Sequence, residues 1–273
     1  MSNIPPVEWP YMVSPEKEPE NDTPEQILDK IIAVAGDNWS RDQQEAVRGA
    51  YELASLLHAD DEHRGQPYVY HLLRNASRIV RQLHVFDYEL VVAVLLHDSV
   101  EDHADALLTI GDKEVPDDSV EAQDSALDFL AELTSERSAY IVKALTNPIN
   151  ISGIKKLPDD ERQERLEDYA RHVEIAVSDE EIGAWMGKFV DWVDNGVNID
   201  KAESDMKLSR LRRLIEKYEL IMPILEERYY YGVKATLVPE AQEYAEEMFD
   251  EGVKRLSKMK RFLAFGSVAI TTE

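Results

Sequence analysis

Signals for the start of an α-helix recur along this chain, and apolar residues at helical spacing follow each of them. Thr23 precedes Pro24, which suits an N-cap followed by proline at the first helical position. Ser40 and Gln43 have the spacing of a capping box, and Asp87 is suited to cap a later helix. No stretch shows the convincing alternation of apolar and polar residues that is typical of a half-buried strand. These patterns predict an all-α fold.

Helical spacing also predicts how the chain is divided. After two helices that follow Thr23 and Ser40, helices are expected over residues 66–84, 87–98, 121–133, 136–146, 160–177, 180–199, 203–228 and from Pro239 to about 263. Residues 103–120 and 148–159 are expected to be loops. Residues 1–22 are expected to form an extended arm, residues 23–236 the main domain and residues 237–273 a C-terminal helical extension.

Charge and cysteine content exclude several classes of function. The chain has 55 acidic and 30 basic residues and a formal net charge of −25, which repels nucleic acid. It contains no cysteine, so any metal site must use histidine and carboxylate ligands. No apolar run approaches the roughly 18 residues needed to cross a bilayer, and the N-terminus lacks the pattern of a secretory signal. We therefore expect a cytoplasmic protein that binds neither nucleic acid nor membrane.

Potential metal ligands and proton acceptors follow an apolar segment of the chain. Residues 95–102 read LLHDSVED, so His97, Asp98, Glu101 and Asp102 come directly after the run VVAVLL. A charge at the end of a buried segment is costly unless it is paired or binds a cation. The segment therefore indicates a cation site, with a helix that simply ends in water as the plain alternative.

Two further residues are suited to complete such a site. His71 lies on the helix before the one that ends in His97, and two helices joined by a short loop pack antiparallel, which can bring both imidazoles together. Asp191 lies in the apolar sequence KFVDWVDN, and Asn195 follows four residues later on the same helical face. Taken alone, His71 also fits an ordinary amphipathic helix, and Asp191 fits a surface position beside Lys188.

Three motifs in order, GQPYVYH, LLHDSVED and KFVDWVDN, resemble the signatures of the HD phosphohydrolase superfamily. More narrowly, they resemble the hydrolase domain of RelA/SpoT-type (p)ppGpp hydrolases and their small stand-alone relatives. The resemblance covers roughly residues 40–200 and implies an HD-domain helical bundle that hydrolyses a phosphate ester, in the nearest relatives the 3′-pyrophosphate of ppGpp. It implies that a divalent metal, typically manganese, is held by His71, His97, Asp98 and Asp191.

The same resemblance implies roles for the residues around the metal. The catalytic acidic pair falls on Glu101 and Asp102, and the residue that contacts the substrate falls on Asn195. Arg64 is the nearest cation to the first motif, and Lys188 opens the third motif, so both are candidates for substrate contact.

The chain departs from the family pattern where the base of the nucleotide would bind. The family's basic pair before the glycine of the first motif is replaced by a segment that reads Glu62-His63-Arg64, and the glutamate of that motif is Gln66. An arginine of the third motif is replaced by Trp192. The substrate is therefore left open between (p)ppGpp and another nucleotide phosphate ester. A catalytically quiet module that binds a nucleotide is a further alternative, against which the retained acidic pair counts.

The histidine pattern predicts a single metal at this site. Two-metal HD phosphodiesterases need two more histidines between the His-Asp pair and the last aspartate, and only His103 and His172 lie there. His103 is too close to the pair to suit that arrangement. The expected partner is a nucleotide or another small phosphorylated molecule, and the C-terminal helix is a candidate surface for core packing or self-association.

Overall fold

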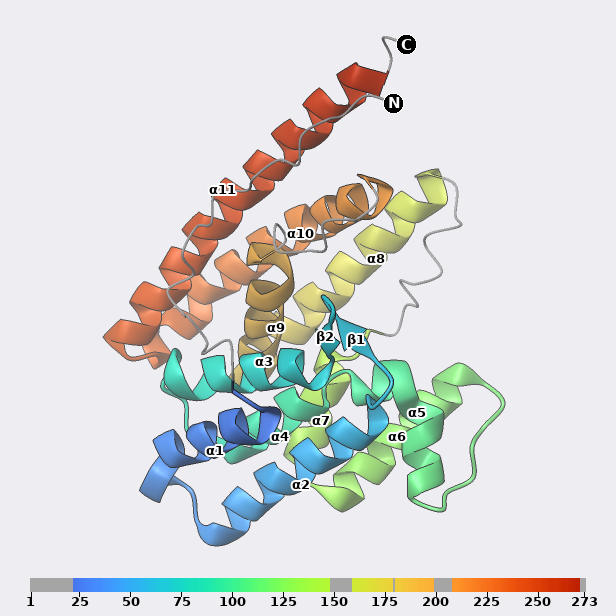
Figure 1. The fold of residues 1–273 in the computed structure, drawn as a ribbon, viewed down its shortest axis with the longest axis vertical. Helices are drawn as coiled ribbons and strands as arrows, with labels where there is room; N and C mark the ends of the chain where they lie inside the picture. The colour runs from blue at the N-terminus through green and yellow to red at the C-terminus, as the bar shows by residue number, and fades with distance from the viewer. Residues whose placement is uncertain (1–21, 148–158, 179, 199–207, 271–273) are drawn as a thin grey trace.

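The computed structural model describes residues 22–147, 159–178, 180–198 and 208–270, and these residues form the all-α fold that the sequence predicts (Figure 1). Its α-helices are α1 (Pro24–Ala35), α2 (Arg41–Leu57), α3 (Val69–Arg81), α4 (Tyr88–Leu96), α5 (Ser99–Ile110), α6 (Ser119–Leu133), α7 (Glu136–Leu145), α8 (Asp159–Ser178), α9 (Ile182–Trp192), α10 (Leu208–Arg228) and α11 (Pro239–Ile270). Apart from one residue each, the predicted arm and the second predicted loop lie outside the described residues.

The helix-start signals act as predicted. Thr23 caps α1 in a reciprocal capping box with Gln26, and Ser40 caps α2 in the same way with Gln43. The side chain of Asp87 accepts hydrogen bonds from two backbone N–H groups in the first turn of α4. These side chains satisfy N–H groups that have no partner within the helix.

The prediction of a loop over residues 103–120 is wrong for its first half. Helix α5 continues to Ile110, and only residues 111–118 separate it from α6. Leu107 and Leu108 are buried, because this helix packs against α2 and α6. The burial of two leucines stabilises helix where the acidic composition favours a loop.

A short hairpin that the sequence analysis did not predict precedes α3. Strands β1 (Glu62–His63) and β2 (Gln66–Pro67) pair antiparallel across Arg64 and Gly65. Both turn residues have positive φ, 55° for Arg64 and 72° for Gly65, as tight two-residue hairpin turns require. The hairpin fixes the segment that leads into the first motif.

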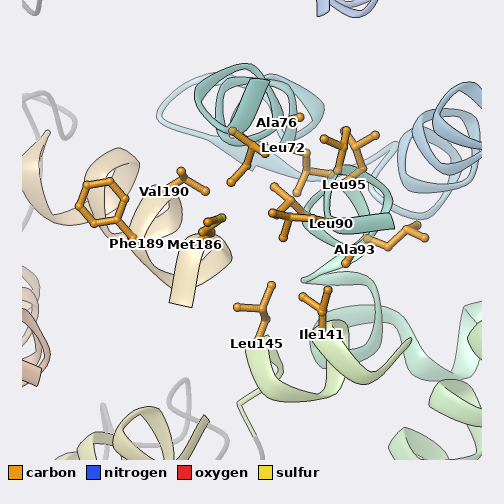
Figure 2. Close-up of a cluster of buried hydrophobic side chains, with 14 of the residues drawn as sticks. Leu72, Ala76, Leu90, Ala93, Leu95, Ile141, Leu145, Met186, Phe189 and Val190 are labelled. Carbon is orange, nitrogen blue, oxygen red and sulfur yellow. The ribbon is translucent and has the colours of Figure 1, made fainter. Parts of the chain in front are cut away.

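The core surrounds α4, which is buried along its whole apolar run from Leu90 to Leu96. A helix that is apolar on all sides is stable only when other elements cover it, and α4 contacts α2, α3, α7 and α9. Figure 2 shows side chains from α3, α4, α7 and α9 meeting in this core. Because α4 is enclosed, the residues that follow its last turn emerge inside the molecule.

The C-terminal helix shares this core. Helix α11 packs against α10, and its Phe249 ring contacts Phe189 and Trp192 of α9 at 5.4 Å between centroids. Tyr244, Met248, Leu256 and Met259 are buried on the same helix, whereas Val253 is 47% exposed. None of the described helices combines the length and apolar character that a membrane span requires.

Candidate metal centre

The structure brings together the four residues that the motifs indicate as metal ligands. His71 is buried in α3, His97 and Asp98 lie where α4 meets α5, and Asp191 lies in the last turn of α9. His71 Nε2 is 3.3 Å from Asp191 Oδ1, and His97 Nε2 is 3.0 Å from Asp98 Oδ2. The remaining histidine–carboxylate separations are 3.7 and 3.8 Å. Asp98 and Asp191 therefore each place a carboxylate oxygen within 3.8 Å of both imidazole Nε2 atoms.

These separations fit a divalent cation. Metal bonds of about 2.0–2.2 Å to nitrogen and oxygen place neighbouring ligand atoms about 3.0–3.5 Å apart. Two of the four separations lie in this range, and the other two are slightly longer. His97 Nε2 is enclosed and has no hydrogen-bond partner among the described residues, although two carboxylates face it. A buried nitrogen without a partner is costly, and a bound cation would satisfy it. The residues present therefore fit a divalent metal.

An outer layer of hydrogen bonds orients each ligand. His71 Nδ1 donates to Asp194 Oδ2 at 2.8 Å, and His97 Nδ1 donates to the carbonyl oxygen of Val94 at 2.8 Å. Since Nδ1 carries the proton in each neutral ring, Nε2 presents its lone pair to the centre. The Tyr68 hydroxyl donates to Asp98 at 2.7 Å.

Asp194 is the outer residue that the sequence analysis missed. Arg74 donates to both of its carboxylate oxygens at 2.8 Å, and Arg78 donates at 2.9 Å. Burial alone would raise the pKa of Asp194, but the two arginines and His71 hold it well below its usual value. The only local signal is its position three residues after Asp191, on a neighbouring part of the helix surface.

The ligands influence one another's protonation. Burial lowers the pKa of His97, but Asp98 and Asp191 outweigh burial and raise that pKa well above its usual value. The same contacts with His71 and His97 lower the pKa of Asp191, against the effect of burial. Protons would therefore compete with a bound cation for these nitrogens.

The acidic pair of the second motif lies beside the ligands. Glu101 Oε2 accepts a hydrogen bond from the backbone N–H of Asn147 at 3.0 Å. Burial and the nearby charge of Asp98 raise the pKa of Glu101 to about 7. The same two causes raise the pKa of Asp102, which is more exposed, to about 6. Carboxyl groups with such pKa values can exchange protons near neutral pH.

The three residues predicted to contact substrate each have a protein partner. Asn195 donates to Asp191 Oδ1 at 2.7 Å, so it also supports a ligand. Arg64 Nη2 donates to the carbonyl oxygen of Asp194 at 2.7 Å. The Lys188 ammonium group donates to the carbonyl oxygen of Leu145 at 2.7 Å. These contacts fix the side chains near the centre, and their contact with substrate stays a prediction.

Lys217 of α10 is a second residue that the sequence analysis missed. Its ammonium nitrogen lies 4.6 Å from the ring centroid of Tyr169 and 5.5 Å from that of Tyr218. It makes no hydrogen bond or ion pair within the described residues, although it is partly buried in a strongly acidic protein. Burial lowers its pKa, but Tyr218 and the acids Asp191 and Glu101 outweigh burial and raise it. A lysine on a helix surface carries no local signal of this placement.

No protein-family model matches this chain, and a comparison with the sequences of curated proteins gives no match. The structure on its own shows an all-helical domain with buried clusters of histidine and aspartate that could hold a metal.

Proposed function

We propose that this chain is a metal-dependent phosphohydrolase of the HD type that acts on a nucleotide. The 3′-pyrophosphate of (p)ppGpp is the first substrate to test. The observation that supports this proposal best is the convergence of His71, His97, Asp98 and Asp191 in the described fold, with Glu101 beside them. Manganese is the proposed cation, since two imidazoles and two carboxylates without sulfur suit manganese or iron.

The chemistry divides between the cation and the acidic pair. When bound, a divalent cation would stabilise the negative charge that develops on the phosphoryl oxygens. Glu101 takes the proton of the attacking water, because its pKa of about 7 matches proton transfer near neutral pH. The water oxygen forms a bond to phosphorus while the bond from phosphorus to the leaving oxygen breaks, and the leaving oxygen takes up a proton from solvent. Asp102 is more exposed and returns the proton to solvent.

Lys217 and Lys188 would hold the anionic part of the substrate. The ammonium groups of both lysines lie near the ring of Tyr169, at 4.6 and 5.8 Å from its centroid. Both groups are close enough to lower the pKa of Glu101. A phosphate substrate must overcome the net charge of −25 on the chain, so a local pair of cations favours its binding.

Another nucleotide phosphate ester is a second candidate substrate, and a specific observation favours it. His63 occupies part of the segment where the resembled family has its basic pair, and its ring stacks on His71 at 4.7 Å. Burial lowers the pKa of His63 to about 3, so the ring is neutral. The neighbouring Glu62 is exposed and acidic. A neutral and an acidic side chain would not hold a base as two cations do.

A panel of substrates tests the proposal. The manganese-loaded chain would be incubated with ppGpp, nucleoside triphosphates and cyclic nucleotides, and released phosphate and pyrophosphate would be measured. We expect release from at least one nucleotide and none from a His97→Ala chain. Tight binding of a nucleotide without any release would instead indicate a module that only binds.

A further inference from the structure

A second group of potential metal ligands shares no residue with the first. His58 follows the last turn of α2, Asp61 precedes β1, and His103 lies in α5. Asp61 Oδ2 is 2.8 Å from His58 Nδ1 and 2.6 Å from His103 Nε2. We call these three residues the His58 cluster. None of them is a ligand of the first centre.

The fold holds both rings of the His58 cluster in place. The Tyr68 ring stacks on His58 with centroids 4.6 Å apart, and the His103 ring meets His58 edge-on at 4.5 Å. The backbone of α5 leaves helical geometry at His103, with φ −137° and ψ 29°. Ligands that are locked before a metal arrives bind it better than mobile ligands.

The His58 cluster differs from another histidine–aspartate group of the same fold in the charged residues that surround it. In the group of His63, His71 and Asp194, two arginines already neutralise the carboxylate. No lysine or arginine in the described part of the chain pairs with Asp61, and its only ionic contacts are the two imidazoles. The cluster therefore offers two nitrogen donors and an anionic oxygen without a competing fixed cation.

Burial also favours the neutral form of the His58 imidazole, which a metal ligand must have. His58 Nε2 is enclosed without a hydrogen-bond partner among the described residues, so a doubly protonated ring would leave a buried N–H unsatisfied. Burial correspondingly lowers the pKa of His58. The side chains of Asp61 and His103 are 38% and 23% exposed, which leaves a path for an ion and room for water ligands.

We propose that His58, Asp61 and His103 form a second cation site, which takes zinc or another divalent metal that prefers imidazole. Ligation through His58 Nδ1 places the remaining proton on the enclosed Nε2, where it has no acceptor. We therefore expect this site to bind roughly 10- to 100-fold more weakly than the first. The site goes beyond the proposed function, and it touches the first centre through Tyr68, which stacks on His58 and donates to Asp98.

Metal stoichiometry tests this proposal without any measurement of turnover. The metal-free full chain would be titrated with Zn²⁺ by calorimetry, and we expect two equivalents per chain. His103→Ala should keep only the tighter equivalent and Asp191→Asn only the weaker one. His84→Asn is the matched control, because His84 is exposed, lies at φ 53° and belongs to neither centre. It should keep both equivalents.

Two outcomes would overturn the second site. In the first, the wild-type chain binds a single equivalent of Zn²⁺, and the substitution Asp191→Asn abolishes this binding. The other is a His103→Ala chain that still binds two. If either variant loses its helical circular dichroism, Asp61→Asn in the otherwise natural chain removes the anionic ligand of the second site alone. Retention of two equivalents in that variant counts equally against the proposal.

Discussion

At the scale of single residues, a substitution at Glu101 distinguishes the proposed catalytic role of this residue from metal binding. Glu101→Gln keeps the size of the side chain and removes the basic oxygen. We expect kcat to fall by about 10²- to 10⁴-fold while bound manganese stays nearly unchanged. His97→Ala should lose the metal and the activity together. Metal content per chain and turnover, measured on both variants, check this division.

The pH profile provides a second check on Glu101. The residue accepts a proton only when it is ionised, so kcat should fall as the pH drops through its pKa. That pKa is about 7 without a cation, and a bound cation lowers it, so the midpoint should lie at or below about 7. The acidic limb should be absent in Glu101→Gln. If that variant loses metal as fully as His97→Ala, Glu101 is a ligand instead.

Asp194 is a buried carboxylate outside the candidate ligand set that pairs with two arginines and with His71. Asp194→Asn leaves Arg74 and Arg78 without their anionic partner in a buried environment. We expect a loss of about 3–5 kcal/mol in the free energy of unfolding, and a 10- to 100-fold weaker metal affinity of the order found for outer-layer changes. Denaturant unfolding and metal titration measure the two effects.

The control for Asp194 is an exposed ion pair. Asp29 pairs with Arg48 at 2.7 Å, and its side chain is 63% exposed. Asp29→Asn should cost no more than about 1 kcal/mol and leave metal affinity unchanged. Equal effects of the two substitutions would contradict the role given to Asp194.

A substitution at Lys217 tests the proposed site for the anionic part of the substrate. Lys217→Met keeps the apolar stem against Tyr169 and removes the ammonium charge. Because a hydrogen bond to a charged group contributes about 1.5–3 kcal/mol, we expect KM for a phosphate substrate to rise about 10- to 100-fold, with a smaller change in kcat. Lys113→Met, at an exposed lysine paired with Glu132, is the control and should leave KM unchanged. An unchanged KM in Lys217→Met would remove this residue from the substrate site.

At the scale of elements, Arg64 connects the hairpin to the π-helical segment Val193–Val197 that follows α9. Its guanidinium group donates to the carbonyl oxygen of Asp194, while its backbone has a φ of 55°. Arg64→Ala should raise KM more than it lowers kcat, because the side chain also holds this edge of the proposed substrate site. Steady-state kinetics on the true substrate would measure this.

A comparison of Arg64→Gly with Arg64→Ala distinguishes the contribution of the guanidinium group from that of the backbone conformation. Glycine adopts positive φ without strain, so Arg64→Gly should be more stable than Arg64→Ala by about 1 kcal/mol. Both variants should show the same rise in KM. A rise confined to Arg64→Ala would assign the effect to the hairpin turn and not to the guanidinium group.

At the scale of the whole molecule, the candidate metal centre joins three parts of the chain. Its candidate ligands come from α3, the α4–α5 junction and α9, so a bound metal would stabilise the folded chain over the unfolded one. Manganese at 100 times its Kd should add about 2.7 kcal/mol to the free energy of unfolding. Thermal unfolding with manganese and with a chelator measures the difference. It should vanish in Asp98→Asn, and an equal Tm under both conditions in the natural chain would argue against a metal at this centre.

Features that depend on residues a few positions apart could be predicted from the amino-acid sequence alone. The caps at Thr23, Ser40 and Asp87 act within one helical turn, so their spacing was enough to predict them. The motifs likewise indicated four candidate metal ligands, and the structure brings these residues together. The extent of α5 was predicted wrongly, because the burial of Leu107 depends on distant helices and not on the acidic composition around it.

The residues that surround the candidate ligands became visible only in the folded chain. Asp194 bonds to His71 across 123 positions of the chain, and Asp61 meets His103 across 42. Lys217 comes close to Glu101 from a helix outside the three motifs. Such contacts depend on how packed helices are rotated and shifted relative to one another. The burial of many apolar side chains determines this packing collectively, so the spacing of residues within one segment does not predict it.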